Sequence, residues 1–272
     1  MLPFAPLPLH LRNWRFMRPT PLLVIVVGVL FARVPFASPQ DASPSAGPST
    51  RETLYYNIEW RLFTAGKARV EIKPVSQPSH PEYQLNLHLE SAGFVSKLYK
   101  VEDDYSVLMN AEFCAQSSQM TSHEGSRQRE TRIAFDGEAK KARYLERDRL
   151  KNTIVLQQEI DIPECVHDVI GGLFFVRTLN LEPGQSTQIP VSDGKKSVMA
   201  KLEAQQREDV KTPLGIFKAI RYEIYLFGGV LYKRTAHINL WLTDDRQKLP
   251  VQIRVRMQFT IGTINLLLEK HE

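Results

Sequence analysis

The sequence predicts a mainly β protein: a large curved antiparallel sheet or half-barrel, with a helix at about 166–179 packed on its concave face. Apolar and polar residues alternate strictly over 83–90, 236–243 and 251–260, a pattern typical of strands with one buried and one solvated face. Such one-sided burial favours an antiparallel sheet over a parallel one. In the second segment the solvated face is expected to comprise His237, Asn239, Trp241 and Thr243.

Further strands are expected from shorter runs of the same kind. In chain order they lie at 54–61, 67–74, 103–110, 128–136, 141–147, 153–160, 196–208, 216–227 and 263–270. Asp136-Gly137 and Asp193-Gly194 are dipeptides typical of hairpin turns. The turn at 244–248 joins the strands 236–243 and 249–260, and a short helical turn is expected at Gly93–Tyr99.

The segment 166–179 breaks the strand pattern. It places apolar residues at helical spacing and is followed by Pro183-Gly184, which is typical of a helix end. If the sheet and this helix enclose a ligand cavity, its lining is expected to include Val169, Ile170, Leu173 and Phe174. The alternative is that the helix fills the concavity and forms a solid core.

The first 52 residues predict export. Residues 1–38 hold a basic start, an apolar run of eleven residues at 21–31 and a small-residue exit, as a secretory signal does. A spanning helix needs about 20 apolar residues, but cleavage after Ala37 would place Pro35 at an unfavourable position, so an uncleaved membrane anchor remains the alternative. Residues 39–52 are a Ser/Pro-rich flexible linker, and 53–272 are expected to form a single β-rich domain.

Charge and cysteine content agree with a location in the periplasm or cell envelope of a Gram-negative-type bacterium. Four arginines and no acidic residue lie in 1–38, whereas the rest of the chain holds 31 basic and 30 acidic residues, so nucleic acid is not an expected partner. In an oxidising compartment Cys114 and Cys165 are expected to form a disulfide. Two free thiols in the core are the alternative.

Familiar catalytic motifs are absent from the sequence, which holds no G-x-S-x-G, no H-E-x-x-H and no phosphate-binding loop. Cys165, His167 and Asp168 are the nearest to a constellation, but residues adjacent in sequence seldom converge on one point. We therefore expect no catalytic residue, cofactor or metal ligand, and a protein that is not an enzyme.

Several motifs in order resemble the bacterial family numbered 3108 among domains of unknown function. They are LYYNIEW at 54–60, AGKA at 65–68, CVHDVI at 165–170, TPLGIF at 212–217 and INLWLTDD at 238–245. The resemblance covers roughly 52–270 and implies an exported or envelope-associated protein with a β-rich fold. That fold is similar in outline to the curved half-barrels that carry lipoproteins in the outer-membrane localisation pathway. The resemblance implies no activity and no catalytic residue.

Three functions follow as hypotheses. The first is a non-enzymatic envelope protein that binds a lipid, an acyl chain or a lipoprotein segment on its concave sheet. The second is an envelope scaffold or interaction module, whose partner is another envelope protein and which has no small-molecule ligand. The third is a hydrolase with a non-standard site, for instance His167 with Asp168 and an acid from another strand. An uncleaved N-terminal segment would add association with the membrane.

Overall fold

The computed structural model describes residues 51–60, 63–75, 82–226, 236–256 and 262–272. The predicted signal segment 1–38 lies outside the described residues, as does the predicted linker up to residue 50. The chain divides into a unit Met1–Asp41 and a unit Ala42–Glu272, and the second holds everything described. Within these ranges, the helices are too short or too polar to cross a bilayer.

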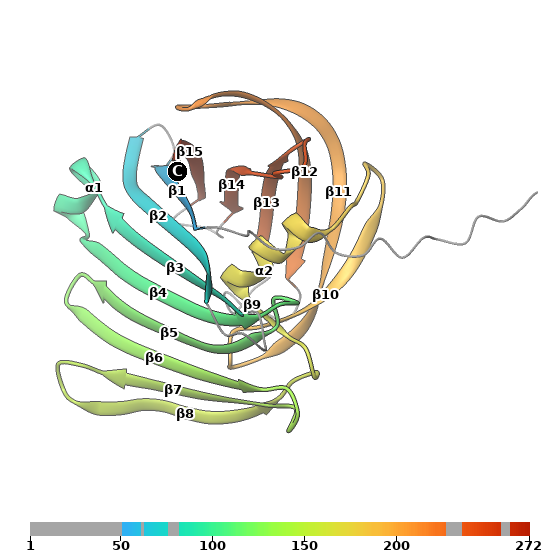
Figure 1. Ribbon diagram of the computed structural model, residues 1–272. Coiled ribbons are helices and arrows are strands. Elements are labelled where there is room, and N and C mark those ends of the chain that lie inside the picture. Colours follow the sequence, from blue (N-terminus) through green and yellow to red (C-terminus); the bar gives the residue numbers. More distant parts are fainter. Residues whose placement is uncertain (1–50, 61–62, 76–81, 227–235, 257–261) are drawn as a thin grey trace, which may run out of the picture. The chain divides into compact units, whose positions relative to one another are not determined.

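The described residues form one large sheet, so the predicted mainly β fold is confirmed (Figure 1). Its strands are β1 (Glu52–Trp60), β2 (Phe63–Val75), β3 (Glu82–Ser91), β4 (Val101–Asn110), β5 (Ala115–Glu124), β6 (Arg127–Asp136), β7 (Lys141–Asp148), β8 (Thr153–Asp161), β9 (His167–Asp168), β10 (Ser186–Ser192), β11 (Ser197–Thr212), β12 (Gly215–Leu226), β13 (Ala236–Thr243), β14 (Pro250–Arg256) and β15 (Thr263–His271).

The order of strands across the sheet is β8-β7-β6-β5-β4-β3-β2-β1-β15-β14-β13-β12-β11-β10-β9. Neighbours pair antiparallel except β9 and β10, which pair in parallel. Since β8 and β9 stand at the two edges, the sheet is open in the described part of the chain. The order follows the sequence apart from one long-range step, the pairing of the first strand with the last.

The sheet curls around helix α2 (Val169–Phe175), which continues as a short 3₁₀ turn, η1 (Val176–Thr178) (Figure 1). Asp168, just before α2, accepts a hydrogen bond from the hydroxyl of Tyr105 on β4. The same residue pairs with Ser192 of β10. β4 and β10 are far apart in the strand order, so the segment that leads into α2 bridges distant parts of the sheet.

The predicted helix at 166–179 begins too early. His167 and Asp168 instead form β9, and the backbone carbonyl of Val166 accepts a hydrogen bond from the amide of Ala115 at 2.8 Å. The helix starts at Val169 because the Asp168 carboxylate accepts from the amides of Ile170 and Gly171, which is the geometry of an N-cap. The short helix predicted at Gly93–Tyr99 is present as α1 (Gly93–Leu98).

The outer face of β13 was expected to be solvated, but it is buried at Trp241. Trp241 is only 3% exposed. Its indole nitrogen donates to the Glu208 carboxylate at 2.5 Å, and the Arg254 guanidinium lies 5.0 Å from the ring centroid. The Glu208 side chain of β11 and the Arg254 side chain of β14 therefore cover the indole, which also packs among buried apolar side chains.

Two apolar clusters form the core, and α2 lies between them. The first gathers side chains mainly from β1–β7 and includes Phe174 of α2. The second gathers side chains from β10–β14, and Leu173 of α2 packs against it. η1 is anchored by Arg177, which makes a two-pronged ion pair with Glu52 at the start of β1, with donor–acceptor distances of 2.6 and 3.0 Å. The helical segment is thereby fixed to β1, in the middle of the sheet, as well as to β4.

Candidate functional site

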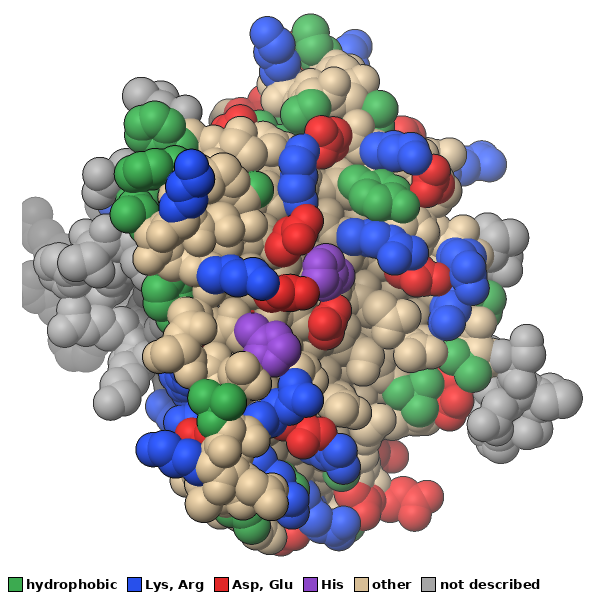
Figure 2. Space-filling model, turned by 90° about the vertical axis from the view of Figure 1, so that its left-hand side faces the viewer, with side chains coloured by type: hydrophobic (Ala, Val, Ile, Leu, Met, Phe, Trp, Pro, Cys, Tyr) green, Lys and Arg blue, Asp and Glu red, His purple; other side chains and the backbone are tan. Residues whose placement is uncertain are grey.

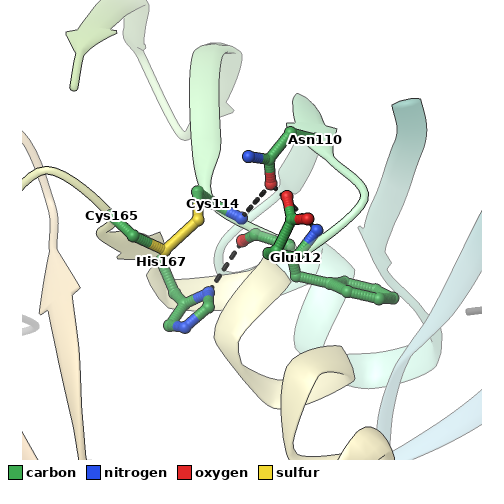
Figure 3. The surroundings of a disulfide bond; sticks show 6 residues. Asn110, Glu112, Cys114, Cys165 and His167 are labelled. Atoms are coloured by element: carbon green, nitrogen blue, oxygen red, sulfur yellow. Dashed lines mark hydrogen bonds between the residues drawn. A yellow bond between two sulfur atoms is a disulfide. The ribbon is translucent and has the colours of Figure 1, made fainter. Parts of the chain in front are cut away.

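A disulfide joins Cys114 to Cys165 and fixes the segment that leads into α2 (Figure 3). On one side, the Asn110 side-chain oxygen accepts from the amide of Cys114 at 2.8 Å. On the other, Nδ1 of His167 donates to the carbonyl of Phe113 at 2.7 Å. Burial lowers the pKa of His167, so the imidazole is favoured in its neutral form. The predicted pairing of the two cysteines is thus present, and it ties β9 to the start of β5.

Asp168 is the buried polar centre of this region. Its carboxylate accepts from Tyr105 Oη and from two amides at the start of α2, those of Ile170 and Gly171. Burial raises the pKa of Asp168, while the three hydrogen bonds oppose that shift. The same burial, together with the neighbouring carboxylate, raises the pKa of Tyr105. One side chain therefore caps the helix and fixes it to the inner face of β4.

A cavity of about 320 Å³ opens between the inner face of β3–β7 and the start of α2. This volume is at the lower end of the range found for small-molecule sites. The sheet and the helix supply an apolar lining that comprises Leu87, Leu89, Met120, Ile133, Val169 and Ile170. Asp168 and Tyr105 meet at its inner wall, and Asp103 lies farther along β4.

The turn between β10 and β11 covers the cavity from the side opposite the sheet. The Lys195 ammonium lies 5.1 Å from the ring centroid of Tyr144 on β7, and the Lys195 carbonyl accepts from the Gln158 amide at 3.1 Å. Gly194 has a φ of 77° and lies so close to Ile133 that an added Cβ would come within 2.8 Å of that side chain. Only a residue without a side chain lets the turn approach the sheet this closely.

Two polar groups of the cavity have pKa values raised by their surroundings. Partial burial and the nearby Glu124 raise the pKa of Asp103 to about 6. Burial also raises the pKa of Tyr144 to about 12. An apolar lining with a few polar groups suits an amphiphile, whose chain takes the apolar surface and whose polar end meets the hydroxyls and carboxyls.

The structure separates the four residues that were expected to line a cavity. Val169 and Ile170 line it, whereas Leu173 and Phe174 point into the two core clusters. The sheet residues that make most of the lining were not singled out from the sequence. The sequence feature that could have identified them is the period-two alternation in β4, which places Asp103 and Tyr105 on the same face as the buried Val107.

The constellation Cys165, His167 and Asp168 does not converge on one point. Cys165 is bonded to Cys114 and has no free thiol. The imidazole of His167 stacks on Phe175 with ring centroids 4.0 Å apart, while Asp168 faces Tyr105 and α2. Among the described residues, no group of three or more His, Cys, Asp or Glu side chains is placed to hold a metal ion.

A larger hollow, about 480 Å³, lies on the outer face of β2–β5. It is polar, and the charges that line it pair with one another: Arg69 with Glu71 at 3.5 Å, and His88 with Asp104 at 2.8 Å. Figure 2 shows acidic and basic side chains interleaved around two histidines on this side of the molecule. Because its charges are already matched at the surface, we take the inner cavity as the candidate site.

Comparisons with known proteins agree on the family and the fold. The family model described as "Protein of unknown function (DUF3108)" matches residues 55–269. Among curated proteins none matches the sequence. A beta-barrel-like protein of the domain of unknown function DUF1849 from Brucella abortus has a similar structure, with a TM-score of 0.52 at 8% identity over 84% of this chain and 99% of that chain.

Two further solved structures show weaker similarity. A protein of YmcC-like fold from Bacteroides fragilis, described as a candidate exported protein, has a TM-score of 0.32 at 9% identity over 85% of this chain and 100% of that chain. A candidate lipoprotein from Parabacteroides distasonis has a TM-score of 0.32 at 10% identity over 86% of this chain and 100% of that chain. At such identities the Brucella structure shows a shared fold and no more.

Proposed function

The chain belongs to the DUF3108 family, and from this premise we propose that it is an exported protein of the bacterial cell envelope that binds the acyl chain of a lipid or lipoprotein in its inner cavity. The predicted signal segment supports export, and the disulfide suits an oxidising compartment. On this proposal the protein is a carrier or receptor, not an enzyme.

The observation that carries the proposal is the cavity between the sheet and α2. Its walls come from the sheet, from the helix start and from the β10–β11 turn, and the sheet and the helix supply the apolar surface. The volume of about 320 Å³ holds part of an acyl chain or one small amphiphile. Tyr105 and Asp168 would contact the more polar end of such a ligand, because their hydroxyl and carboxyl groups lie at the wall.

Native mass spectrometry of the full chain, released gently from the envelope, tests the proposal. We expect a bound lipid whose occupancy falls when Met120→Trp fills the cavity. Gln119→Trp is the matched control, since it adds the same side chain at the adjacent, exposed position on the outer face of β5. Equal lipid occupancy in both variants, or protein that never carries lipid, would refute the proposal.

The second candidate function is an envelope scaffold that acts without a small-molecule ligand. The edge strand β8 favours it, because Ile154 and Val155 on this strand are 54% and 47% exposed. Exposed edge strands pair readily with other chains. Crosslinking in whole cells separates the two candidates: a scaffold recovers the same partner protein from wild type and from Met120→Trp.

A further inference from the structure

One end of the strands exposes several large apolar side chains. The antiparallel order brings the start of β2, α1, the β5–β6 turn and the β7–β8 turn to this same end. We call residue 63 together with 92–100, 124–127 and 148–152 the α1 rim. Its exposed apolar side chains are Phe63 (63%), Phe94 (69%), Leu98 (66%), Tyr99 (52%) and Leu150 (63%). Large exposed apolar residues on one side of a molecule mark an interaction surface.

The α1 rim is held firmly by backbone hydrogen bonds. The amide of Ala92 donates to the carbonyl of Ala65 at 2.8 Å, and the amide of Gly125 donates to the carbonyl of Lys100 at 2.7 Å. The ring of Tyr99 lies against Gly125, where an added Cβ would approach it to 2.9 Å. α1 itself contains no buried residue. Its apolar side chains are therefore presented to the surroundings on a fixed backbone.

Phe94 and Leu98 lie on one face of α1, because residues four apart are neighbours on a helix. Lys97 lies on the same helix, while Lys100, just beyond it, pairs with Glu102 at 2.9 Å; 92–100 contains no acidic residue. The outward face of α1 is thus apolar and basic together.

The β7–β8 turn repeats this combination, with Leu150 between Arg149 and Lys151. Its acid, Asp148, is engaged within the protein: the carboxylate accepts from the amides of Leu150 and Lys151, each at 3.0 Å, and pairs with Arg129. Figure 2, which views the side where α1 lies, shows apolar and basic side chains next to each other at the margins of this face.

We propose that the α1 rim docks on the surface of an anionic phospholipid bilayer. Exposed aromatic and leucine side chains interleaved with lysines are what interfacial segments use, since the apolar groups enter the headgroup region and the ammonium groups meet lipid phosphates. A protein partner fits less well, because the apolar residues are spread over several turns and do not line a groove. The surface differs from the cavity and from the N-terminal apolar segment.

Docking of the α1 rim would also set which end of the cavity faces the bilayer. Leu89, which lines the cavity, lies on β3 just before the chain enters α1, and Asp103 lies on β4 just after it. The end of the cavity near these residues is therefore the end closest to the rim. A lipid acyl chain leaving the bilayer would have a short path to the inner face of the sheet.

The test uses the full chain with a single added thiol that carries an environment-sensitive fluorophore. Leu98→Cys places the probe on the rim, and Ile216→Cys places it at a residue that is 71% exposed at the opposite end of the strands. Both native cysteines are bonded to each other, so only the new thiol is labelled. On vesicles of phosphatidylglycerol and phosphatidylcholine we expect a several-fold rise in emission at 98 and none at 216.

Charge variants complete the test. Lys97→Gln and Lys151→Gln should each weaken the vesicle affinity read at position 98 by about five-fold, since one lysine near an anionic surface contributes about 1 kcal/mol. Lys211→Gln, at the far end of β11, should leave it unchanged. Any of three results would overturn the proposal: no change in emission at position 98, equal changes at 98 and 216, or an equal change at 98 on pure phosphatidylcholine. Met120→Trp should not change the response, so failure of docking and failure of lipid binding in the cavity are distinguishable.

Discussion

Asp168 serves two structural purposes with one carboxylate. It caps α2 and it satisfies the buried hydroxyl of Tyr105. Asp168→Ala should lower the free energy of unfolding by about 2–4 kcal/mol, because a lost cap costs about 1 kcal/mol and an unpaired buried polar group about 1–3 kcal/mol. Urea denaturation measures the change. Asp104→Ala, which removes an exposed carboxylate from β4, the strand of Tyr105, should cost less than about 0.5 kcal/mol.

Asp103 gives stability a pH dependence of unusual sign for a carboxylate. Its pKa is raised to about 6 from 3.8, so the native protein holds this proton more tightly than the unfolded chain. The free energy of unfolding therefore falls as pH rises through the window from about 4 to about 6. Burial of Asp168 acts in the same direction.

Asp103→Asn isolates this contribution. The amide keeps an oxygen for the backbone amide of His123 and carries no charge. At pH 7 the variant should be more stable than wild type by about 1–2 kcal/mol, after allowance for partial exposure, and the difference should vanish below about pH 4. Thermal or urea unfolding at a series of pH values gives the comparison. A variant that is less stable at pH 7 would show that the charge itself is needed.

At the scale of elements, α2 approaches β4 closely because of one glycine. A Cβ on Gly171 would lie 2.5 Å from Met109 Sδ and 2.6 Å from Asp168 Oδ1, whereas a Cβ on Gly172 would meet its nearest atom at 3.5 Å. Gly171→Ala should therefore destabilise by about 1–3 kcal/mol through overpacking. Gly172→Ala should be neutral or stabilise by up to about 1 kcal/mol, since alanine is the better helix former. Equal effects of the two substitutions on urea unfolding would contradict this account.

The disulfide fixes β9 and the entry to α2. It spans 51 residues. Replacing both cysteines by alanine should lower the free energy of unfolding by about 3–4 kcal/mol, because the unfolded chain regains the entropy of an open loop. Urea denaturation of the double variant measures the loss. A reducing agent should shift the unfolding of wild type by a similar amount and leave the double variant unchanged.

Most strands could be predicted because alternation on a half-buried sheet is a local signal. β5 was missed because its inward positions include Ser118 and Ser122, which are buried without being apolar. β10 was missed because it is short and contains Pro190. The helix start was misplaced by three residues, since the parallel pairing of β9 with β10 depends on contacts far away in the sequence.

At the scale of the whole molecule, the cavity is less predictable than the sheet. The helix contributes only Val169 and Ile170 of the four residues expected, because the direction in which each side chain points depends on how the sheet curls. The Asp168–Tyr105 contact joins residues 63 positions apart, and nothing local in either segment indicates it. The family could be inferred from the ordered motifs and the β fold from the alternation, because both patterns are visible in the sequence without knowledge of contacts between distant residues.

The pairing of the first strand with the last has a consequence for synthesis. β1 lies between β2 and β15, and Thr53 and Glu272 exchange backbone hydrogen bonds. While the chain emerges from the ribosome, hairpins can form one after another, but β1 and β14 keep open edges until β15 has been made. The complete sheet is therefore a late product of translation. The part of the sheet that holds β1–β8 and the part that holds β9–β14 can therefore join only after β15 has been made.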